Sequence, residues 1–311
     1  MSVVKFVTFE KPDGTFRAGW LLDQEYAVDM YEASSGILPS NLLDFLENSE
    51  ANLEKVASFS FTKEQKGVYP LSELRLKAPL PFPRSFRDFY AFEQHVKQAR
   101  ENRGLGMIPE WYEIPVFYFS NHLAIKGPGE AIVKPEACNW LDYELEIACV
   151  IGKEGRNISA NQADEHIFGY CILNDWSARD LQRKEMKVGL GPAKGKDFST
   201  SIGPWIVTKD ELEPFRAGKG FNLSMKATVN GRLLSAGNMK DLFYSFGEMI
   251  ERASAGVTLI PGEMIGSGTV GSGCILELGD QVHRWLRPGD RVNLEIDHLG
   301  VLQNEIIAEE R

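Results

Sequence analysis

Most of the chain after residue 87 consists of short runs of β-branched and aromatic residues separated by turn residues. Such runs are typical of strands, and few stretches between them have helical apolar spacing, among them SARDLQRKEM and SFGEMIERASA. Because helices do not alternate with strands, the pattern argues against a βαβ protein and predicts an α+β domain that is mostly β. The runs are VFYFS, GEAIVKP, NWLDYELEIACVIG, FGYCILND, PWIVTK, LSMKATVNG, MIGSG, CILEL and RVNLEID.

Three parts of the chain differ in composition and in the secondary structure that their sequence patterns predict. Residues 1–75 read as a small N-terminal α/β domain, with strands in VVKFVTFE and FRAGWLLD and one helix in NLLDFLENSEANLEKVASF. The Pro-rich stretch LKAPLPFPRSF, residues 76–86, interrupts regular structure and predicts a linker. Residues 87–311 form the larger domain, in which the Asn230-Gly231 pair predicts a β-hairpin.

Charge and composition narrow the classes of partner. A formal net charge of −10 argues against nucleic acid as a partner. No apolar run reaches the roughly 18 residues that span a bilayer, and the N-terminus lacks the pattern of an export signal, so we expect a cytoplasmic protein without a membrane partner. The four cysteines have no metal-binding spacing, which favours reduced thiols in the core.

The run NWLDYELEIACVIG, residues 139–152, carries acidic side chains on one strand face. Alternation places the apolar row, which includes Tyr143, Leu145, Ile147 and Cys149, opposite Asp142, Glu144 and Glu146. Such a face is either the solvated outside of a half-buried strand or part of a site that holds a cation. The strand pattern alone leaves both interpretations open.

Two further stretches place acids beside other polar groups. Asp175 ends the run FGYCILND, just before a helix on which Ser177 and Asp180 have the spacing of a capping box and Arg179 and Gln182 share a face. Asp175 is therefore either a helix-capping residue or a functional acid at a strand end.

The stretch RSFRDFYAFEQHVKQAR has the spacing of an amphipathic helix. On that helix Asp88 and His95 would share one face. Clustered carboxylates, here Asp88, Glu144, Glu146 and Asp175, would repel one another and raise one another's pKa values. A hard divalent cation with oxygen ligands removes that cost, which predicts a site for Mg2+ or Mn2+, with Ca2+ also suitable.

Two glycine-containing motifs suggest nucleotide binding but fail in context. GSGTVG is followed by GCILELG, which reads as a strand and not as the helix that a dinucleotide fingerprint needs. GPAKGKDFST has Asp197 after Lys196, where a phosphate loop needs Ser or Thr.

The motifs RDFYAFEQH, DYELE, NDWSARDLQ, GKDF and GSGTVGSG…ILELG, in that order, resemble the fumarylacetoacetate hydrolase (FAH) family over roughly residues 80 to 300. The resemblance implies a mixed β-roll, a homodimer, and Asp88, Glu144, Glu146 and Asp175 as metal ligands. It also implies that Lys196 and Thr200 lie near the metal. The substrate-binding positions would be Tyr90, Tyr118, Arg179, Gln182 and Thr269.

The same resemblance implies the chemistry. His95 and Glu277 match a pair that activates water in the hydrolytic branch of the family, although Glu277 taken alone reads as a charged residue on a strand. With Lys196, Arg179 and Gln182 as further catalytic residues, the expected reaction is metal-dependent hydrolysis of a carbon–carbon bond in an acylpyruvate-like β-diketo acid.

Two alternatives stay open. One is an oxaloacetate (keto-acid) decarboxylase or isomerase of the same family, although the smaller decarboxylases have Glu three residues after the histidine, where this chain has Gln98. The other is a protein that binds metal or metabolite without turnover. Met186 stands where animal fumarylacetoacetases carry Tyr, which argues against fumarylacetoacetate itself as substrate. The loop ARENRGLGMIPEW, with Gly104 and Gly106 as hinges, is an expected lid.

Overall fold

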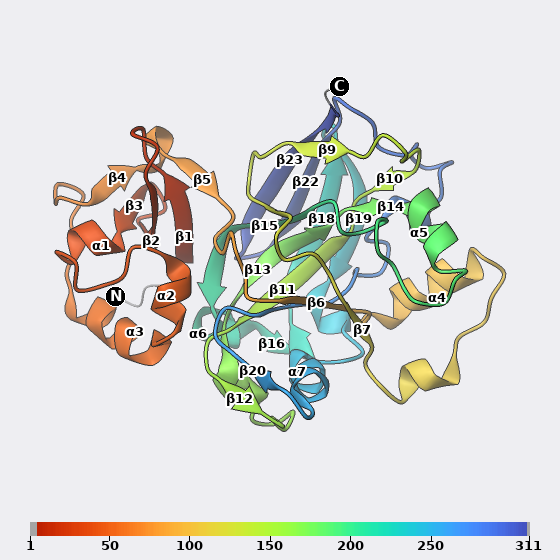
Figure 1. Ribbon diagram of the computed structural model, residues 1–311, viewed down its shortest axis with the longest axis horizontal. Helices are drawn as coiled ribbons and strands as arrows, with labels where there is room; N and C mark the ends of the chain where they lie inside the picture. Colours follow the sequence, from red (N-terminus) through yellow and green to blue (C-terminus); the bar gives the residue numbers. More distant parts are fainter. Residues whose placement is uncertain (1–4, 310–311) are drawn as a thin grey trace.

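The computed structural model describes residues 5–309 and contains a twisted 12-stranded sheet at its centre (Figure 1). The first two residues of the expected VVKFVTFE strand lie outside the described range. The strand order is β4 (Val68–Pro70), β3 (Tyr26–Asp29), β2 (Phe16–Leu22), β1 (Lys5–Glu10), β15 (Thr200–Thr208), β13 (Ile167–Asp175), β11 (Leu145–Ile151), β21 (Met264–Gly266), β6 (Phe86–Phe89) and β7 (Phe117–Phe119), with β5 (Arg75–Lys77) on β1 and β8 (Ile125–Lys126) on β15. Asp88, Glu146 and Asp175 lie on β6, β11 and β13, and β21 lies between β6 and β11.

A second sheet of five strands packs beside the first. Its order is β19 (Arg232–Asn238), β18 (Ser224–Val229), β22 (Arg291–Ile296), β23 (Gly300–Ala308) and β9 (Ile132–Lys134). The hairpin between β18 and β19 is confirmed, with Asn230 and Gly231 at φ angles of 51° and 81°, which a two-residue turn of this kind requires. Two-stranded ladders join β10 (Leu141–Asp142) to β14 (Ser177–Ala178), β12 (Gly155–Arg156) to β20 (Thr258–Leu259), and β16 (Arg216–Ala217) to β17 (Gly220–Phe221).

Helices are short and lie around the sheets. They are α1 (Met30–Ala33), α2 (Leu42–Leu46), α3 (Ser49–Ser58), α4 (Glu93–Glu101), α5 (Arg179–Glu185), α6 (Lys209–Leu212), α7 (Phe246–Ser254) and α8 (Ile275–Leu278). Helix α7 begins where Ser245 and Glu248 form a capping box. None of the helices within residues 5–309 is long and apolar enough to cross a membrane. The prediction of an α+β protein that is mostly β is confirmed.

Strand β11 is buried on both faces. Leu145 and Ile147 lie in the large core that includes residues of the second sheet, whereas Ala148 and Val150 lie in a second core with Phe6 of the N-terminal strands. The carboxylates that precede Ala148 on that face therefore point into the protein. The interpretation of this face as a solvated outer surface is wrong.

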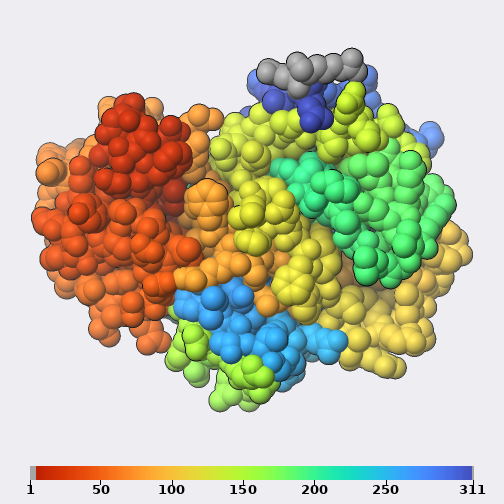
Figure 2. Space-filling view, in the orientation of Figure 1, coloured from red at the N-terminus to blue at the C-terminus, as the bar shows by residue number. Residues whose placement is uncertain are grey.

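The N-terminal residues form a lobe of their own in the space-filling view (Figure 2). Their strands nevertheless continue the central sheet, because β1 pairs with β15. The single helix expected over residues 41–59 is two helices, because Asn48, at φ −135° and ψ 49°, leaves the helical conformation between them. The Pro-rich stretch is not free of regular structure, because its first two residues complete β5, which pairs with β1.

Candidate functional site

Four carboxylates meet at one end of the central strands. Asp88 lies on β6, Glu144 immediately precedes β11, Glu146 lies on β11, and Asp175 ends β13. One ligand atom from each lies within 4.8 Å of those of the other three, and all four side chains are buried. The structure thus brings together the whole set that the family resemblance implies as metal ligands.

Two buried cations face this cluster. The Nζ of Lys196 donates to Glu144 and, at 2.6 Å, to Asp175. The guanidinium of Arg179 lies 2.8 Å from Glu144 and 2.9 Å from Asp142. Four acids thus share two positive charges, of which Arg179 is also shared with Asp142, so the cluster keeps an excess of negative charge.

Burial and the excess negative charge shift the pKa values of the cluster residues. Burial, and then the charge of Asp175, raises the pKa of Asp88 well above its ordinary range. Burial, and then the charges of Asp88 and Glu144, does the same to the pKa of Glu146. Burial also acts to raise the pKa of Glu144, but Arg179 and Lys196 outweigh it and hold that pKa below its ordinary value. Asp88 and Glu146 therefore lack a cation of their own.

Two oxygens of the cluster have no hydrogen-bond partner among the described residues: Oε2 of Glu146 and Oδ1 of Asp175. A buried acceptor left unsatisfied costs about 1–3 kcal/mol. Both atoms are carboxylate oxygens, the donors that Mg2+, Mn2+ and Ca2+ prefer. The donor set, its excess charge and its unsatisfied atoms all fit a hard divalent cation.

The expected substrate-binding residues surround the same cluster. The hydroxyl of Tyr118 donates to Asp175, and Oγ1 of Thr269 donates to Glu146 over 3.2 Å. Thr200 is the register partner of Asp175 across β13 and β15. Arg179 donates to Oε1 of Gln182 over 3.2 Å, so the predicted shared face of that pair is observed.

His95 and Glu277 form a buried pair. Nδ1 of His95 lies 2.5 Å from Oε1 of Glu277. The backbone N–H groups of Ser272 and Gly273 donate to the Glu277 carboxylate over 2.8 and 3.2 Å, which fixes its position. In the tautomer of His95 that donates from Nδ1 to this carboxylate, Nε2 carries the free lone pair.

The pair faces the carboxylate cluster. The ring of Tyr90 lies edge-on to His95, with centroids 5.2 Å apart, and the charge of a protonated His95 acts on Glu144. Burial raises the pKa of Tyr90 to about 12. His95 and the acids therefore belong to one site.

Two predicted elements that carry these residues are wrong. RSFRDFYAFEQHVKQAR is strand β6 followed by helix α4, because Phe86 to Phe89 pair with β21 and β7. Asp88 and His95 thus reach the site from different elements. The stretch CILEL is helix α8, because Asp142 accepts the N–H groups of Ile275 and Leu276 at its start.

Sequence reasoning also missed Asp142 as the residue that joins Arg179 to α8, although the DYELE motif contains it. The predicted capping box at α5 is wrong. Ser177 donates to the backbone oxygen of Asp175, and Asp180 accepts from the N–H of Asn139. Asp175 is therefore a cluster residue and not a helix cap.

The GSGTVG loop lies between β21 and α8, so the strand expected after it is wrong. The loop instead packs against the β6–α4 connection. A Cβ on Gly268 would lie 2.4 Å from the backbone oxygen of Phe89, and one on Gly271 would lie 2.5 Å from the Gln94 side chain. These glycines allow close packing of protein on protein, and Gly268 N donates to Asp88 over 3.2 Å.

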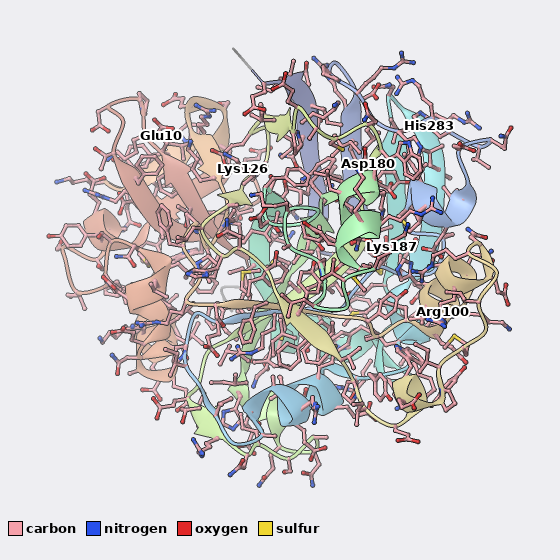
Figure 3. The ribbon with its side chains drawn as sticks, turned by 45° about the vertical axis from the view of Figure 1, so that its right-hand side comes forward. Glu10, Arg100, Lys126, Asp180, Lys187 and His283 are labelled. Atoms are coloured by element: carbon pink, nitrogen blue, oxygen red, sulfur yellow. The ribbon has the colours of Figure 1, made fainter. Side chains whose placement is uncertain are left out.

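The loops that follow α4 and α5 are exposed. Leu105 and Ile108 of the expected lid are 46% and 42% exposed, and Met186 after α5 is 48% exposed. Figure 3 shows Lys187, which follows Met186, on the same side of the molecule as Arg100 of α4. The role of the first loop as a lid stays a prediction.

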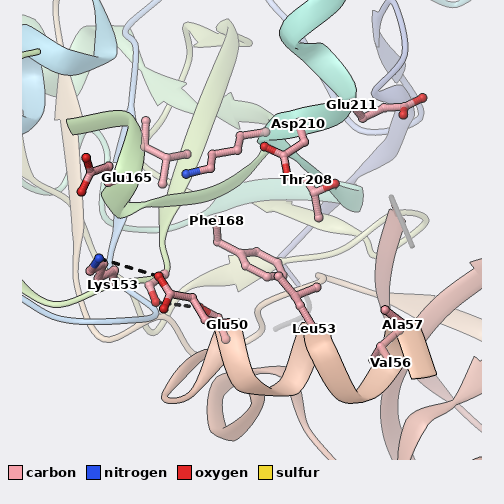
Figure 4. Close-up of a pocket in the computed structure, with 14 residues that line it drawn as sticks. Glu50, Leu53, Val56, Ala57, Lys153, Glu165, Phe168, Thr208, Asp210 and Glu211 are labelled. Carbon is pink, nitrogen blue, oxygen red and sulfur yellow. Dashed lines mark hydrogen bonds and ion pairs between the residues drawn. The ribbon is translucent and has the colours of Figure 1, made fainter. Parts of the chain in front are cut away.

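A cavity of about 340 Å³ lies elsewhere, between α3 and the start of β13 (Figure 4). Leu53 and Phe168 line its apolar part, and the ion pair of Lys153 with Glu50, 3.7 Å apart, crosses its edge. None of the predicted site residues lines it. The cavity is thus separate from the carboxylate cluster.

The mostly β fold and the buried acidic cluster are those of an enzyme family, which the comparisons identify. Residues 84–307 match the family described as Fumarylacetoacetate (FAA) hydrolase C-terminal. The chain belongs to the fumarylacetoacetate hydrolase family.

One relative and one solved structure match nearly the whole chain, and a second relative matches 69% of it. The chain is 32% identical to Oxaloacetate tautomerase YisK of Bacillus subtilis, with 97% of this chain and 100% of the relative covered. It is 30% identical to the Fumarylacetoacetase of Arabidopsis thaliana, with 69% and 62% covered. A solved fumarylacetoacetate hydrolase from Exiguobacterium antarcticum superimposes with a TM-score of 0.76 at 27% identity, covering 98% of this chain and 100% of that one.

Proposed function

We propose that the protein is a metal-dependent tautomerase that interconverts the keto and enol forms of a small 2-oxo dicarboxylate of the oxaloacetate type. The observation that carries the proposal is the buried His95–Glu277 pair beside the four-carboxylate cluster. The full-length similarity to an oxaloacetate tautomerase supports it.

Asp88, Glu144, Glu146 and Asp175 would hold one Mg2+ or Mn2+. A divalent cation bound there would supply Lewis-acid polarisation of the 2-oxo group of the substrate. Lys196 adds a fixed positive charge beside the cluster, where negative charge develops on an enolate oxygen.

Arg179 and Gln182 have different roles: Arg179 positions the carboxylate cluster, and Gln182 positions the substrate. Arg179 is occupied by Asp142, Glu144 and Gln182, so its main role is to fix the cluster. Gln182 is partly exposed, and no hydrogen bond from its Nε2 is found within residues 5–309. That amide group is therefore free to donate to a substrate carboxylate.

His95 moves the proton. In the direction from keto to enol, Nε2 of His95 takes a proton from C3 of the substrate, and the electron pair moves to the carbonyl oxygen. The enolate oxygen then takes a proton from solvent to give the enol, and His95 releases its proton to solvent. Glu277 stabilises the imidazolium that results through the hydrogen bond on Nδ1. In the reverse direction the enol oxygen loses its proton to solvent, and His95, protonated from solvent, donates a proton to C3.

Hydrolytic cleavage of a carbon–carbon bond is the second candidate. The geometry that favours it is the same pair, because a histidine oriented by a fixed carboxylate also removes a proton from water. The similarity to a plant fumarylacetoacetase supports this reading for an acylpyruvate-like substrate.

One pair of assays separates the candidates. Enol-oxaloacetate is added with Mg2+, and the keto form is trapped as malate by malate dehydrogenase; in parallel, acetylpyruvate cleavage is followed by release of acetate. We expect ketonisation well above the spontaneous rate, with at least about a 100-fold loss in His95→Ala and none in His166→Ala, a histidine outside the site.

If acetylpyruvate is cleaved in a His95-dependent way and ketonisation is not accelerated, the tautomerase proposal is wrong and the hydrolase proposal is supported. No turnover in either assay would support a protein that only binds metal or metabolite. The homodimer and the cytoplasmic location stay predictions, and size-exclusion chromatography tests the first.

A further inference from the structure

A thiol lies beside the proposed acid–base pair and has no part in the proposed reaction. Sγ of Cys274 lies 3.5 Å from Oε1 of Glu277 and is completely buried. Two other cysteines, Cys149 and Cys171, belong to the apolar cores. Cys274 instead points its sulfur at a carboxylate.

Three ligand types converge there. One ligand atom each from His95, Cys274 and Glu277 lies within 4.8 Å of the other two, and all three side chains are buried. Cys274 is the N-cap of α8 and Glu277 is three residues further on, which holds both side chains on one side of the helix start. His95 faces them from α4.

This set differs in kind from the neighbouring cluster of oxygens. A set of one imidazole, one thiolate and one carboxylate oxygen suits zinc, whereas magnesium prefers oxygen ligands alone. Tetrahedral zinc with the usual bond lengths separates a sulfur and an oxygen ligand by about 3.5 Å. Sγ of Cys274 and Oε1 of Glu277 are already 3.5 Å apart. The distance between Nδ1 of His95 and Oε1 of Glu277 must increase from 2.5 Å to about 3.3 Å.

We infer that His95, Cys274 and Glu277 form a second metal site, selective for Zn2+ and similar transition-metal cations. Occupation of this site prevents the His95–Glu277 pair from acting as acid and base. On binding, the thiol loses its proton to solvent and the Nδ1 proton of His95 moves to Nε2, so one proton is released. The imidazole can then no longer accept a proton from substrate. This consequence rests on the proposed function, whereas the site itself does not.

Cobalt(II) reports the site directly, because a thiolate ligand gives Co2+ a charge-transfer absorption band that oxygen ligands do not. The protein is saturated with Mg2+ and then titrated with Co2+, and Zn2+ is added to displace it. We expect one thiolate-bound Co2+ per chain, bleached by Zn2+. Turnover should fall in proportion to zinc occupancy and return with a chelator.

Two single-cysteine variants make the test specific. Cys274→Ala should lack the band and need at least about 10-fold more Zn2+ for the same occupancy. Cys171→Ala, which removes an equally buried thiol from the apolar core, should keep the band. The band in wild type also tests the site without reliance on any variant.

The outcomes separate the two proposals. No band in the wild type, or equal Zn2+ affinity in wild type and Cys274→Ala, overturns the second metal site. A band that comes with undiminished turnover upholds the site and removes His95 from the proposed function. A band with matched loss of turnover supports both.

Discussion

Binding of a divalent cation should stabilise the fold, and Glu146→Gln should remove that effect. The cluster combines four carboxylates with two cations, Lys196 and Arg179, so full ionisation leaves two negative charges uncompensated. Two of its oxygens have no partner among the described residues, which costs about 2–6 kcal/mol in the absence of metal. A bound divalent cation compensates the excess charge and coordinates the unsatisfied oxygens, and it does so only in the folded state.

The size of the effect follows from mass action. At a Mg2+ concentration of 100 times its dissociation constant, the fold gains about 2.7 kcal/mol. For a chain of this length, 1 kcal/mol corresponds to about 2 °C in Tm, so the gain is about 5 °C.

The gain should grow with pH. Asp88 and Glu146 have raised pKa values in the folded, metal-free protein, so the fold binds more protons than the unfolded chain. Their contribution to metal-free stability is full below the ordinary carboxyl pKa of about 4 and is lost as pH rises toward the raised values. Mg2+ replaces those protons, so metal-free Tm falls with pH in this window and saturating Mg2+ cancels the fall.

Differential scanning calorimetry with Mg2+ or chelator at pH 5 and pH 8 tests this linkage. Glu146→Gln, which keeps the shape without the charge, should gain little from Mg2+. Glu263→Gln, a buried acid paired with Arg87 outside the cluster, should keep the wild-type gain. A wild-type gain below about 1 °C, or equal gains in wild type and Glu146→Gln, would refute the reasoning.

Three further substitutions test separate parts of the account. Glu277→Gln should lower kcat by about 10²–10⁴-fold while the Mg2+-dependent gain in Tm is unchanged; loss of that gain would assign Glu277 to the metal. Gly268→Val, at φ +75° and with its Cβ 2.4 Å from a backbone oxygen, should cost at least about 1–3 kcal/mol in urea unfolding, and a neutral result would contradict the packing role of the loop. Ile147→Ala should cost about 2–5 kcal/mol with unchanged Mg2+ affinity, measured by urea unfolding and calorimetric titration.

Local pattern predicted most of the strands after residue 87, with CILEL as the exception, and it identified the acids that cluster without settling whether they face solvent or a cation. The alternation around Glu144 and Glu146 and the position of Asp175 at a strand end are properties of short segments, and these residues meet as expected. The Asn230-Gly231 hairpin is equally local. Burial on both faces of β11 was not readable, because it depends on N-terminal residues, among them Phe45 of α2, that pack in the same core as Ala148 and Val150.

The errors arise where a distant segment decides the local structure. Phe89 and Val96 have helical spacing, but Phe86 to Phe89 form a strand because β21, about 180 residues further on, pairs with them. Helix α8 exists where a strand was expected because Asp142 supplies the acceptor for its first N–H groups. A sequence window of ten to twenty residues around either segment does not include its distant partner, which is β21 for β6 and Asp142 for α8.

The central claim is that His95 transfers a proton to and from C3 of an enolisable 2-oxo acid. Enol-oxaloacetate should therefore be ketonised by the protein and Mg2+ in D2O, with malate dehydrogenase trapping the product and NMR locating deuterium at C3 of malate. We predict one C3 diastereomer with wild type and an equal mixture with His95→Ala. An equal mixture with wild type, at the spontaneous rate, would contradict the claim.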